Sequence, residues 1–177
     1  PGTRVIGVDF SESMIESGKR KIANTRYHEQ IELRACDVNY LPFADGTFDG
    51  AIIAFGIRNL PDYAGGIREM TRVVKENGRV VILEFTPCCF DGSGHAGIFK
   101  RPFRLYLTKI LPFMGGILSG RRDAYRYLSE SIRDFPDPER LKEIMLEACL
   151  SNVEYRLLTF ATVAVHVGTK IISSECG

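Results

Sequence analysis

The chain has 177 residues, of which 45% are hydrophobic and 25% are charged, with 23 basic and 22 acidic side chains and a formal net charge of +1. Values so close to the average of soluble globular domains exclude a disordered tail, a collagen-like rod and a low-complexity linker protein. The balanced charge argues against a dedicated nucleic-acid binder, which carries a clear basic excess. The length predicts one domain, residues 1–177, with enough chain to bury a core.

In the first part of the chain, short apolar runs alternate with segments of helical spacing. Residues 4–8 have the pattern of a buried strand, Ser11 is a suitable N-cap for a helix, and residues 31–34 have the pattern of a second strand. The uninterrupted apolar run over residues 50–55 favours a strand that is covered on both faces, as in a parallel sheet.

The same alternation continues further along the chain. A helix is expected to begin near Pro61 and to end at Asn77-Gly78, residue types that accept a positive φ, before a strand over residues 79–85. Beyond residue 122, Pro138 is placed to start another helix, and two strands follow near residues 153–158 and 161–169. This order predicts a doubly wound, mostly parallel α/β sheet, which binds ligands at the carboxyl ends of its strands.

The cysteines and the start of the chain give two further expectations. The five cysteines are odd in number and irregularly spaced, without a CxxC pair or a Cys/His ladder, so we expect reduced thiols in an intracellular protein and no metal site. The chain opens on Pro1-Gly2-Thr3, with no initiator Met, no charged leader and no Arg-rich transit segment. We therefore expect a fragment of a longer protein.

Four residues near predicted strand ends are candidates for a ligand site. Asp9 can accept hydrogen bonds from a ribose diol, although an Asp in this position is more often a helix cap. Asp37 can accept from an adenine amino group while Val38 packs against the ring; the alternative is a solvated loop. Ala54 is small enough to let a ligand approach the backbone, but small residues are common in strands.

Residues 55–59, Phe-Gly-Ile-Arg-Asn, are the most specific local feature. They place the cation of Arg58 and the amide of Asn59 directly after a buried strand, at the edge where ligands bind. In the alternative interpretation, Arg58 forms an ion pair across the edge of the sheet, and residues 59–62 are only a turn with a capping residue. Both interpretations stay open from the sequence.

In this order, the segments resemble the class I S-adenosylmethionine-dependent methyltransferases, and more narrowly the ubiquinone/menaquinone biosynthesis C-methyltransferases. The strand-end Asp9 is generic to the class, whereas Phe-Gly-Ile-Arg-Asn at 55–59 and Tyr-Arg-Tyr-Leu at 125–128 are much narrower. Five other segments carry the resemblance, which covers the chain from residue 4 to about residue 170: 5–11, 41–49, 78–85, 136–139 and 163–168.

The resemblance implies that S-adenosylmethionine is the cofactor. Asp9 would hold the ribose hydroxyls, Asp37 and Val38 the adenine, and Ala54, which stands where relatives often have Ser, would line the methionine end. The resemblance also implies that the family's first strand and its glycine-rich loop precede this chain. That strand would lie between the first and third predicted strands, so we expect an interrupted sheet and weak or no cofactor binding by this chain alone.

The implied reaction transfers the sulfonium methyl group to a ring carbon of a polyprenyl benzoquinol or naphthoquinol, whose phenolate must be stabilised and aligned. Arg58 would supply positive charge, Asn59 would orient an oxygen, and Tyr125, Tyr127 and His166 are candidates for handling a proton. Tyr127 and its neighbour Tyr125 are two residues apart and cannot share a helix face, and His166 has the alternative of a hydrogen-bonded strand residue.

Residues 87–103 are the main departure from the family pattern. Residues 87–126 are expected to form an inserted helical cover that faces the substrate and the membrane. Within them, residues 98–126 carry seven basic side chains and one acidic side chain among many apolar ones. That composition suits an interfacial element attracted to anionic lipid, or a basic-fringed helix packed on the sheet.

The implied partners are a polyprenyl quinol, a membrane surface and other quinone-biosynthesis proteins, and a homodimer stays open. The implied compartment is reducing, either the mitochondrial matrix face of the inner membrane or the bacterial cytoplasm. Two other function classes stay open. A nicotinamide-dependent oxidoreductase would also use Asp9, but the downstream segments do not look like that fold. A non-catalytic methyltransferase-fold subunit of a quinone-biosynthesis assembly would keep the same motifs, and a methyl-transfer assay with a short-tailed quinol would decide.

Overall fold

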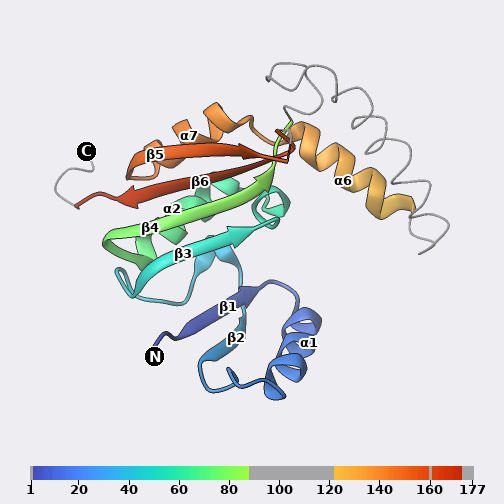
Figure 1. Ribbon diagram of the computed structural model, residues 1–177, viewed down its shortest axis with the longest axis vertical. Coiled ribbons are helices and arrows are strands. Elements are labelled where there is room, and N and C mark those ends of the chain that lie inside the picture. Colours follow the sequence, from blue (N-terminus) through green and yellow to red (C-terminus); the bar gives the residue numbers. More distant parts are fainter. Residues whose placement is uncertain (1, 88–121, 160, 173–177) are drawn as a thin grey trace.

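The computed structural model describes residues 2–87, 122–159 and 161–172, which form an α/β fold (Figure 1). The alternation of strands and helices confirms the predicted fold class. In chain order the elements are β1 (Val5–Asp9), α1 (Glu12–Ala23), β2 (Ile31–Ala35), η1 (Val38–Tyr40), β3 (Phe48–Ala54), η2 (Ile57–Asn59), α2 (Tyr63–Val73), β4 (Val74–Phe85), α6 (Arg122–Asp134), α7 (Pro138–Glu147), β5 (Leu150–Leu158) and β6 (Val163–Lys170), with η denoting a 3₁₀ helix.

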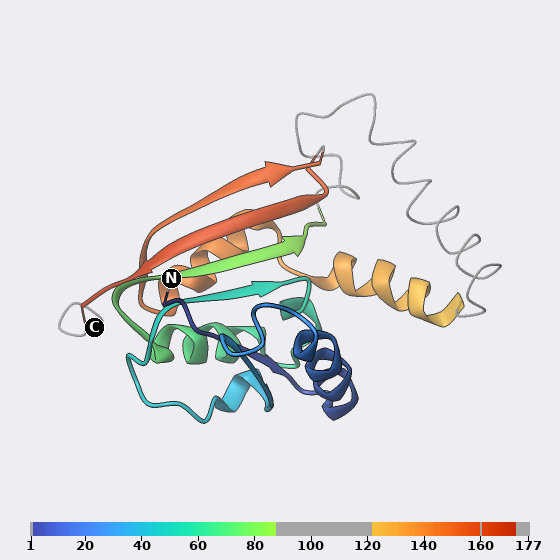
Figure 2. The same cartoon turned by 60° about the horizontal axis from the view of Figure 1, so that its bottom comes forward.

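The described strands form two sheets. β1 and β2 make a parallel pair, whereas the larger sheet has the order β3-β4-β6-β5, with β3 and β4 parallel and β6 antiparallel to both of its neighbours. Figures 1 and 2 show the smaller sheet beside β3, yet among the described strands β1 pairs with β2 alone and β3 with β4 alone. The predicted interruption of the sheet between residues 4–8 and 50–55 is therefore confirmed.

The hydrophobic core lies between the larger sheet and the helices α2 and α7, which cover the same face of that sheet (Figure 2). Ile67 of α2, Ile82 of β4 and Met145 of α7 are completely buried in it. Burying a side chain of this size stabilises the fold by about 1.5–3 kcal/mol. The larger sheet and its two helices contain most of the buried hydrophobic side chains of the described residues.

Helix α7 begins where the sequence predicts. Asp137 is its N-cap and accepts a hydrogen bond from the backbone N–H of Arg140 at 2.8 Å, and Pro138 occupies the first turn, where no N–H is needed. Leu141 and Ile144 are buried against the sheet, as the helical spacing indicates. Local signals are sufficient here because both the cap and the apolar face lie within one short segment.

The expectation that residues 50–55 are covered on both faces is wrong. Ala51 and Ile53 of β3 pack against the core, but the side chain of Ile52 between them is 77% exposed, and Ala54 is exposed as well. Successive side chains of a strand point to opposite faces, and the described helices that pack on the larger sheet cover only one of them. The continuous apolar run therefore records one buried face and one open face.

Helix α2 ends at Val73, and the expectation that it continues to Asn77 is wrong. The next residue, Val74, already has extended backbone and pairs with Phe48 in the sheet. The ammonium group of Lys170 donates to two carbonyls at this end of the helix, at 3.0 and 2.8 Å, which satisfies acceptors that a helix leaves unpaired. Asn77 does adopt a positive φ of 63°, but within a bend of β4.

Hydrogen bonds from Arg72 hold the loop of residues 41–45, which precedes β3, against α2. Arg72 donates to the carboxylates of Glu69 at 2.8 Å and Asp45 at 2.6 Å, and to the carbonyls of Phe43 and Leu41 at 2.8 and 3.0 Å. The hydrogen bonds from Glu69 and Asp45 raise the pKa of Arg72 above its usual range. The Leu-Pro-Phe-Ala-Asp-Gly segment that contributed to the resemblance therefore serves the fold.

Two further expectations concern the cysteines and the segment of residues 87–126. Cys36 is a free thiol, but Cys149 is disulfide-bonded, so the expectation of reduced cysteines is wrong for Cys149. The inserted cover of residues 87–126 lies largely outside the described residues.

Among the helices that the structure does describe, none is long and apolar enough to cross a membrane. No cluster of described His, Cys, Asp and Glu side chains could hold a metal ion.

Candidate cofactor and substrate site

The candidate site lies at the carboxyl ends of the parallel strands. β1 ends at Asp9, β2 at Ala35, β3 at Ala54 and β4 at Phe85. β1 and β3 run in the same direction in Figure 1, and each is parallel to its own sheet neighbour, β2 or β4. In sheets of this kind the loops beyond the carboxyl ends form the ligand-binding crevice. The polar residues just past these ends are therefore the ones to consider.

Asp9 and Asp37 follow the two strands of the smaller sheet and adopt similar local structures. The Oδ1 atom of Asp9 accepts from the backbone N–H of Ser11 at 2.8 Å, and the Oδ1 atom of Asp37 accepts from that of Asn39 at 2.8 Å. The N–H of Cys36 donates to the carbonyl of Asp9 at 3.1 Å, which links the two segments. Among the described residues neither Oδ2 atom has a hydrogen bond, so each carboxylate keeps an oxygen for a ligand.

The helix-cap alternative applies to the two aspartates differently. Ser11, not Asp9, is the N-cap of α1, and its hydroxyl accepts from the first turn of the helix. Asp37 does cap the short helix η1, which begins at Val38. Val38 is half-buried and packs against the core cluster, whereas Ala54 at the end of β3 is exposed. The four residues therefore line one edge, with Val38 fixed most firmly.

Of the two interpretations of Arg58, the structure contains the ion pair. Its Nη1 atom donates to the Oε1 atom of Glu84 at 2.7 Å and to the carbonyl of Phe55 at 2.9 Å. The two charged side chains are 10% and 1% exposed. The guanidinium group also lies 5.5 Å from the centroid of the Phe85 ring. The positive charge of Arg58 is thus already compensated, and Glu84 has to be part of any role assigned to it.

Asn59 and Tyr127 meet at the open side of the same turn. The hydroxyl of Tyr127 donates to the Oδ1 atom of Asn59 at 3.2 Å, although 68 residues separate them in the chain. Tyr127 belongs to α6 and is 55% exposed, and Asn59 is exposed too. The structure therefore brings together two of the proposed catalytic residues. Tyr125, two residues earlier on α6, has a side chain outside the described part of the structure.

His166 lies deeper and has the environment of a structural residue. It pairs with Ile82 in the middle of β4 and is only 1% exposed. Its Nε2 atom lies 2.9 Å from the carbonyl of Pro138 in α7, and its ring centroid is 5.2 Å from that of Tyr155. Burial lowers the pKa of His166, which keeps the imidazole neutral. The geometry is that of the alternative interpretation, a hydrogen-bonded strand residue that anchors α7.

Comparison with known proteins gives the family. Residues 1–170 match the model of the ubiE/COQ5 methyltransferase family. The chain belongs to this family. The demethylmenaquinone methyltransferase of Thermus thermophilus is 45% identical over 170 residues, which are 96% of this chain and 73% of the relative. The ubiquinone/menaquinone biosynthesis C-methyltransferase UbiE of Geobacter sulfurreducens is 38% identical over 96% of this chain and 64% of the relative.

The chain therefore spans about two thirds of the length of these ubiE/COQ5 relatives. Solved structures agree on the fold. An S-adenosylmethionine-dependent methyltransferase from Aquifex aeolicus aligns with a TM-score of 0.63 at 15% identity over 95% of this chain and 69% of that chain. The trans-methyltransferase CalH in complex with S-adenosylhomocysteine aligns with a TM-score of 0.61 at 18% identity over 94% of this chain and 42% of that chain. The predicted methyltransferase fold is confirmed.

The structure adds Glu84, which the sequence analysis of this ubiE/COQ5 family member did not single out. Its signal was present: a single acidic residue stands in the strand segment Val-Val-Ile-Leu-Glu-Phe over residues 80–85. A carboxylate in such a run is buried with its neighbours, and a buried charge requires a partner. Its partner Arg58 lies 26 residues away, in a turn beyond the neighbouring strand.

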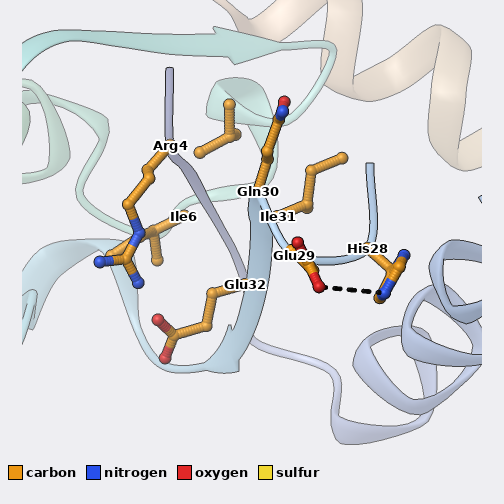
Figure 3. A pocket seen from close by; sticks show the side chains of 8 residues that line it. Arg4, Ile6, His28, Glu29, Gln30, Ile31 and Glu32 are labelled. Atoms are coloured by element: carbon orange, nitrogen blue, oxygen red, sulfur yellow. Dashed lines mark ion pairs between the residues drawn. The ribbon is translucent and has the colours of Figure 1, made fainter. Parts of the chain in front are cut away.

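A pocket of about 270 Å³ lies away from the candidate site, at the amino ends of β1 and β2 (Figure 3). Arg4 and Glu32 flank it on one side, and the ion pair of His28 with Glu29, at 3.9 Å, lies on the other. It is at the opposite end of these strands from Asp9. None of the candidate site residues lines it.

Proposed function

We propose that this protein catalyses the S-adenosylmethionine-dependent C-methylation of a polyprenyl benzoquinol or naphthoquinol in ubiquinone or menaquinone biosynthesis. The observation that carries the proposal is the family match over residues 1–170. Relatives at 38–45% identity bear the names demethylmenaquinone methyltransferase and ubiquinone/menaquinone biosynthesis C-methyltransferase. The chemical class of the reaction follows from both.

The described residues fit the nucleoside part of the cofactor. The free Oδ2 atom of Asp9 can accept from ribose hydroxyls, and that of Asp37 from the adenine amino group, while Val38 offers an apolar surface beside it. Ala54 adds a small side chain at the end of β3, where the methionine part would pass. Two carboxylates next to an apolar side chain match the donors and the flat ring of an adenosine.

When bound, S-adenosylmethionine would supply a sulfonium methyl group to a quinol ring carbon, leaving S-adenosylhomocysteine, and the displaced ring proton would pass to water. Asn59 and Tyr127 are the exposed polar groups at the turn after β3, and they can orient and stabilise the quinol oxygen as it becomes a phenolate. Arg58 is buried next to Asn59 in the chain and supports this turn through its ion pair with Glu84.

The polyprenyl tail of the substrate suggests membrane contact, which we base on composition alone. Residues 98–126 combine seven basic side chains with many apolar ones, a combination that binds anionic lipid surfaces. We propose that this segment brings the protein to the membrane surface. Flotation with anionic liposomes at low salt, lost at high salt, would support the proposal, and flotation at neither salt concentration would contradict it.

The function is tested with the full-length protein, methyl-labelled S-adenosylmethionine and a short-tailed quinol of each type. We expect label in the ring of one quinol. Asp9→Ala should weaken cofactor binding by about tenfold or more, since it removes an acceptor for two hydroxyls. Asp49→Ala is the matched control, because Asp49 is an exposed aspartate at the other end of β3 that pairs with Lys75. Cofactor binding without transfer to either quinol would overturn the proposed function.

A further inference from the structure

Glu84 occupies an unusual position for a carboxylate. It is the last buried residue of β4, and it is 1% exposed. Its Oε1 atom accepts from the Nη1 atom of Arg58 at 2.7 Å and from the backbone N–H of Phe85 at 2.8 Å, and its Oε2 atom lies 3.5 Å from the backbone nitrogen of Arg58. One carboxylate thus holds both the main chain and the side chain of Arg58. Such a group fixes a turn rather than a single side chain.

The turn that Glu84 holds, residues 55–59, is also restrained by other contacts. Phe55 enters it with a positive φ of 54°, a conformation that is unfavourable for a bulky residue and persists only when its surroundings enforce it. Its carbonyl accepts from the Nη1 atom of Arg58, and its ring lies 4.9 Å from that of Phe85. The N–H of Asn59 closes the turn on the carbonyl of Gly56 at 3.1 Å.

Asn59 is the residue that this turn presents to the outside. Its Oδ1 atom is engaged by the hydroxyl of Tyr127 at 3.2 Å. Among the described residues its Nδ2 group has no hydrogen bond, so both of its protons can be donated to a ligand. The buried pair of Arg58 with Glu84 and the exposed pair of Asn59 with Tyr127 therefore belong to one unit, with its anchor inside and its polar group outside.

We propose that Glu84 is a positioning residue of the methyl-transfer site: it holds the Arg58–Asn59 turn so that the Asn59 amide donates to the quinol oxygen. This inference rests on the proposed function. It also gives the charge of Arg58 a different task from direct stabilisation of the phenolate. The guanidinium group locks the turn to the end of β4, and its charge is balanced by Glu84 at 2.7 Å.

The test is a double-mutant cycle in the full-length protein. Glu84→Asp keeps the charge but withdraws it by one methylene from its three donors, and Asn59→Ala removes the amide. We expect Glu84→Asp to lower kcat by about tenfold or more when Asn59 is present, and by less than about threefold in the Asn59→Ala background, since residues that act as a unit are not additive. The dissociation constant of S-adenosylhomocysteine should stay within about twofold in all variants.

Glu69→Asp is the matched control. Glu69 also pairs with an arginine: its Oε1 atom accepts from the Nε atom of Arg72 at 2.8 Å. This pair lies in the second half of α2 and does not hold the turn of residues 55–59. It should leave kcat unchanged. Equal losses of kcat from Glu84→Asp in both backgrounds, or a loss of cofactor binding in parallel, would overturn the positioning role.

Amide hydrogen exchange separates this inference from the proposed function. Glu84→Asp should speed exchange at the N–H groups of Arg58 and Asn59 by about tenfold or more, with no change at Met70 in the buried face of α2. Unaltered exchange at the two turn amides overturns the inference whether or not the protein transfers methyl groups. A wild-type protein that binds cofactor but methylates neither quinol fails the proposed function, while the exchange result still decides the role of Glu84.

Discussion

The two sheets of this protein both contribute residues to the proposed ligand-binding edge, but they differ in how firmly they are packed. In the amino-terminal unit, formed by β1, α1 and β2, Ile15 is the single buried residue among residues 2–37. In the central unit, formed by β3 to β6 with α2 and α7, a core of completely buried side chains lies beneath the sheet. An isolated two-stranded sheet is marginally stable at best.

The ion pairs of the two units show the same contrast. Arg34 and Glu32 of β2 lie 2.6 Å apart with their side chains 44% and 42% exposed, whereas Arg58 and Glu84 lie 2.7 Å apart and are 10% and 1% exposed. Nearly equal distances therefore conceal different energetic roles. The proposed cofactor residues Asp9 and Asp37 belong to the loosely packed unit, whereas the proposed substrate residue Asn59 belongs to the tightly packed one.

The largest expected effect comes from removing one member of the buried pair. Glu84→Ala should lower the free energy of unfolding by about 3–5 kcal/mol, because it leaves the guanidinium group of Arg58 buried without its counter-charge. Glu32→Ala, in the exposed pair, should leave the urea midpoint unchanged within error. Urea titrations followed by circular dichroism measure both. Equal losses would remove the contrast between the units.

Two isoleucines on neighbouring strands give the next effect. Ile82→Ala should cost about 2–5 kcal/mol of stability, since it opens a cavity in the core. Ile52→Ala should change stability by less than about 0.5 kcal/mol, because this side chain is 77% exposed. The same urea titrations apply. A large loss from Ile52→Ala would mean that the open face of β3 is covered in the full-length protein.

Cofactor binding should stabilise the amino-terminal unit more than the central one. S-adenosylhomocysteine at about 100 times its dissociation constant stabilises the bound conformation by about 2.7 kcal/mol. We expect it to slow amide exchange strongly in β1 and β2, which carry the segments of Asp9 and Asp37, and little in β4 and β6. Exchange that slows uniformly across both sheets would show that the two units already unfold together without ligand.

The smallest effect is a pH dependence carried by His166. Burial lowers the pKa of His166 below its usual value of 6.5, so the unfolded chain binds a proton more readily than the folded one. Stability should therefore be complete above about pH 6.5 and decline as the pH falls from there toward the lowered pKa. His166→Gln should flatten this slope of the unfolding free energy. His28→Gln is the control, since the side chain of His28 is 55% exposed, and it should keep the slope.

Local signals predicted the elements whose determinants lie within one segment. Ser11 was predicted as the cap of α1 and Pro138 as the start of α7, and both predictions are confirmed because each signal is adjacent in the chain to the helix it starts. The end of α2 was not readable. Val74 leaves the helix because it pairs with Phe48, a partner 26 residues earlier that no local pattern indicates.

The sequence by itself determined the α/β class, the family and the strand ends at which Asp9, Asp37 and Asn59 stand, because these follow from periodicity and short motifs. Only the tertiary structure decided what Arg58 does. The pairing of Ala54 with Leu83 in the parallel sheet brings the ends of β3 and β4 together and thereby places Glu84 beside the turn. A charge at the end of a strand is a free cation or half of a buried pair depending on its neighbour in space, and strand register sets that neighbour.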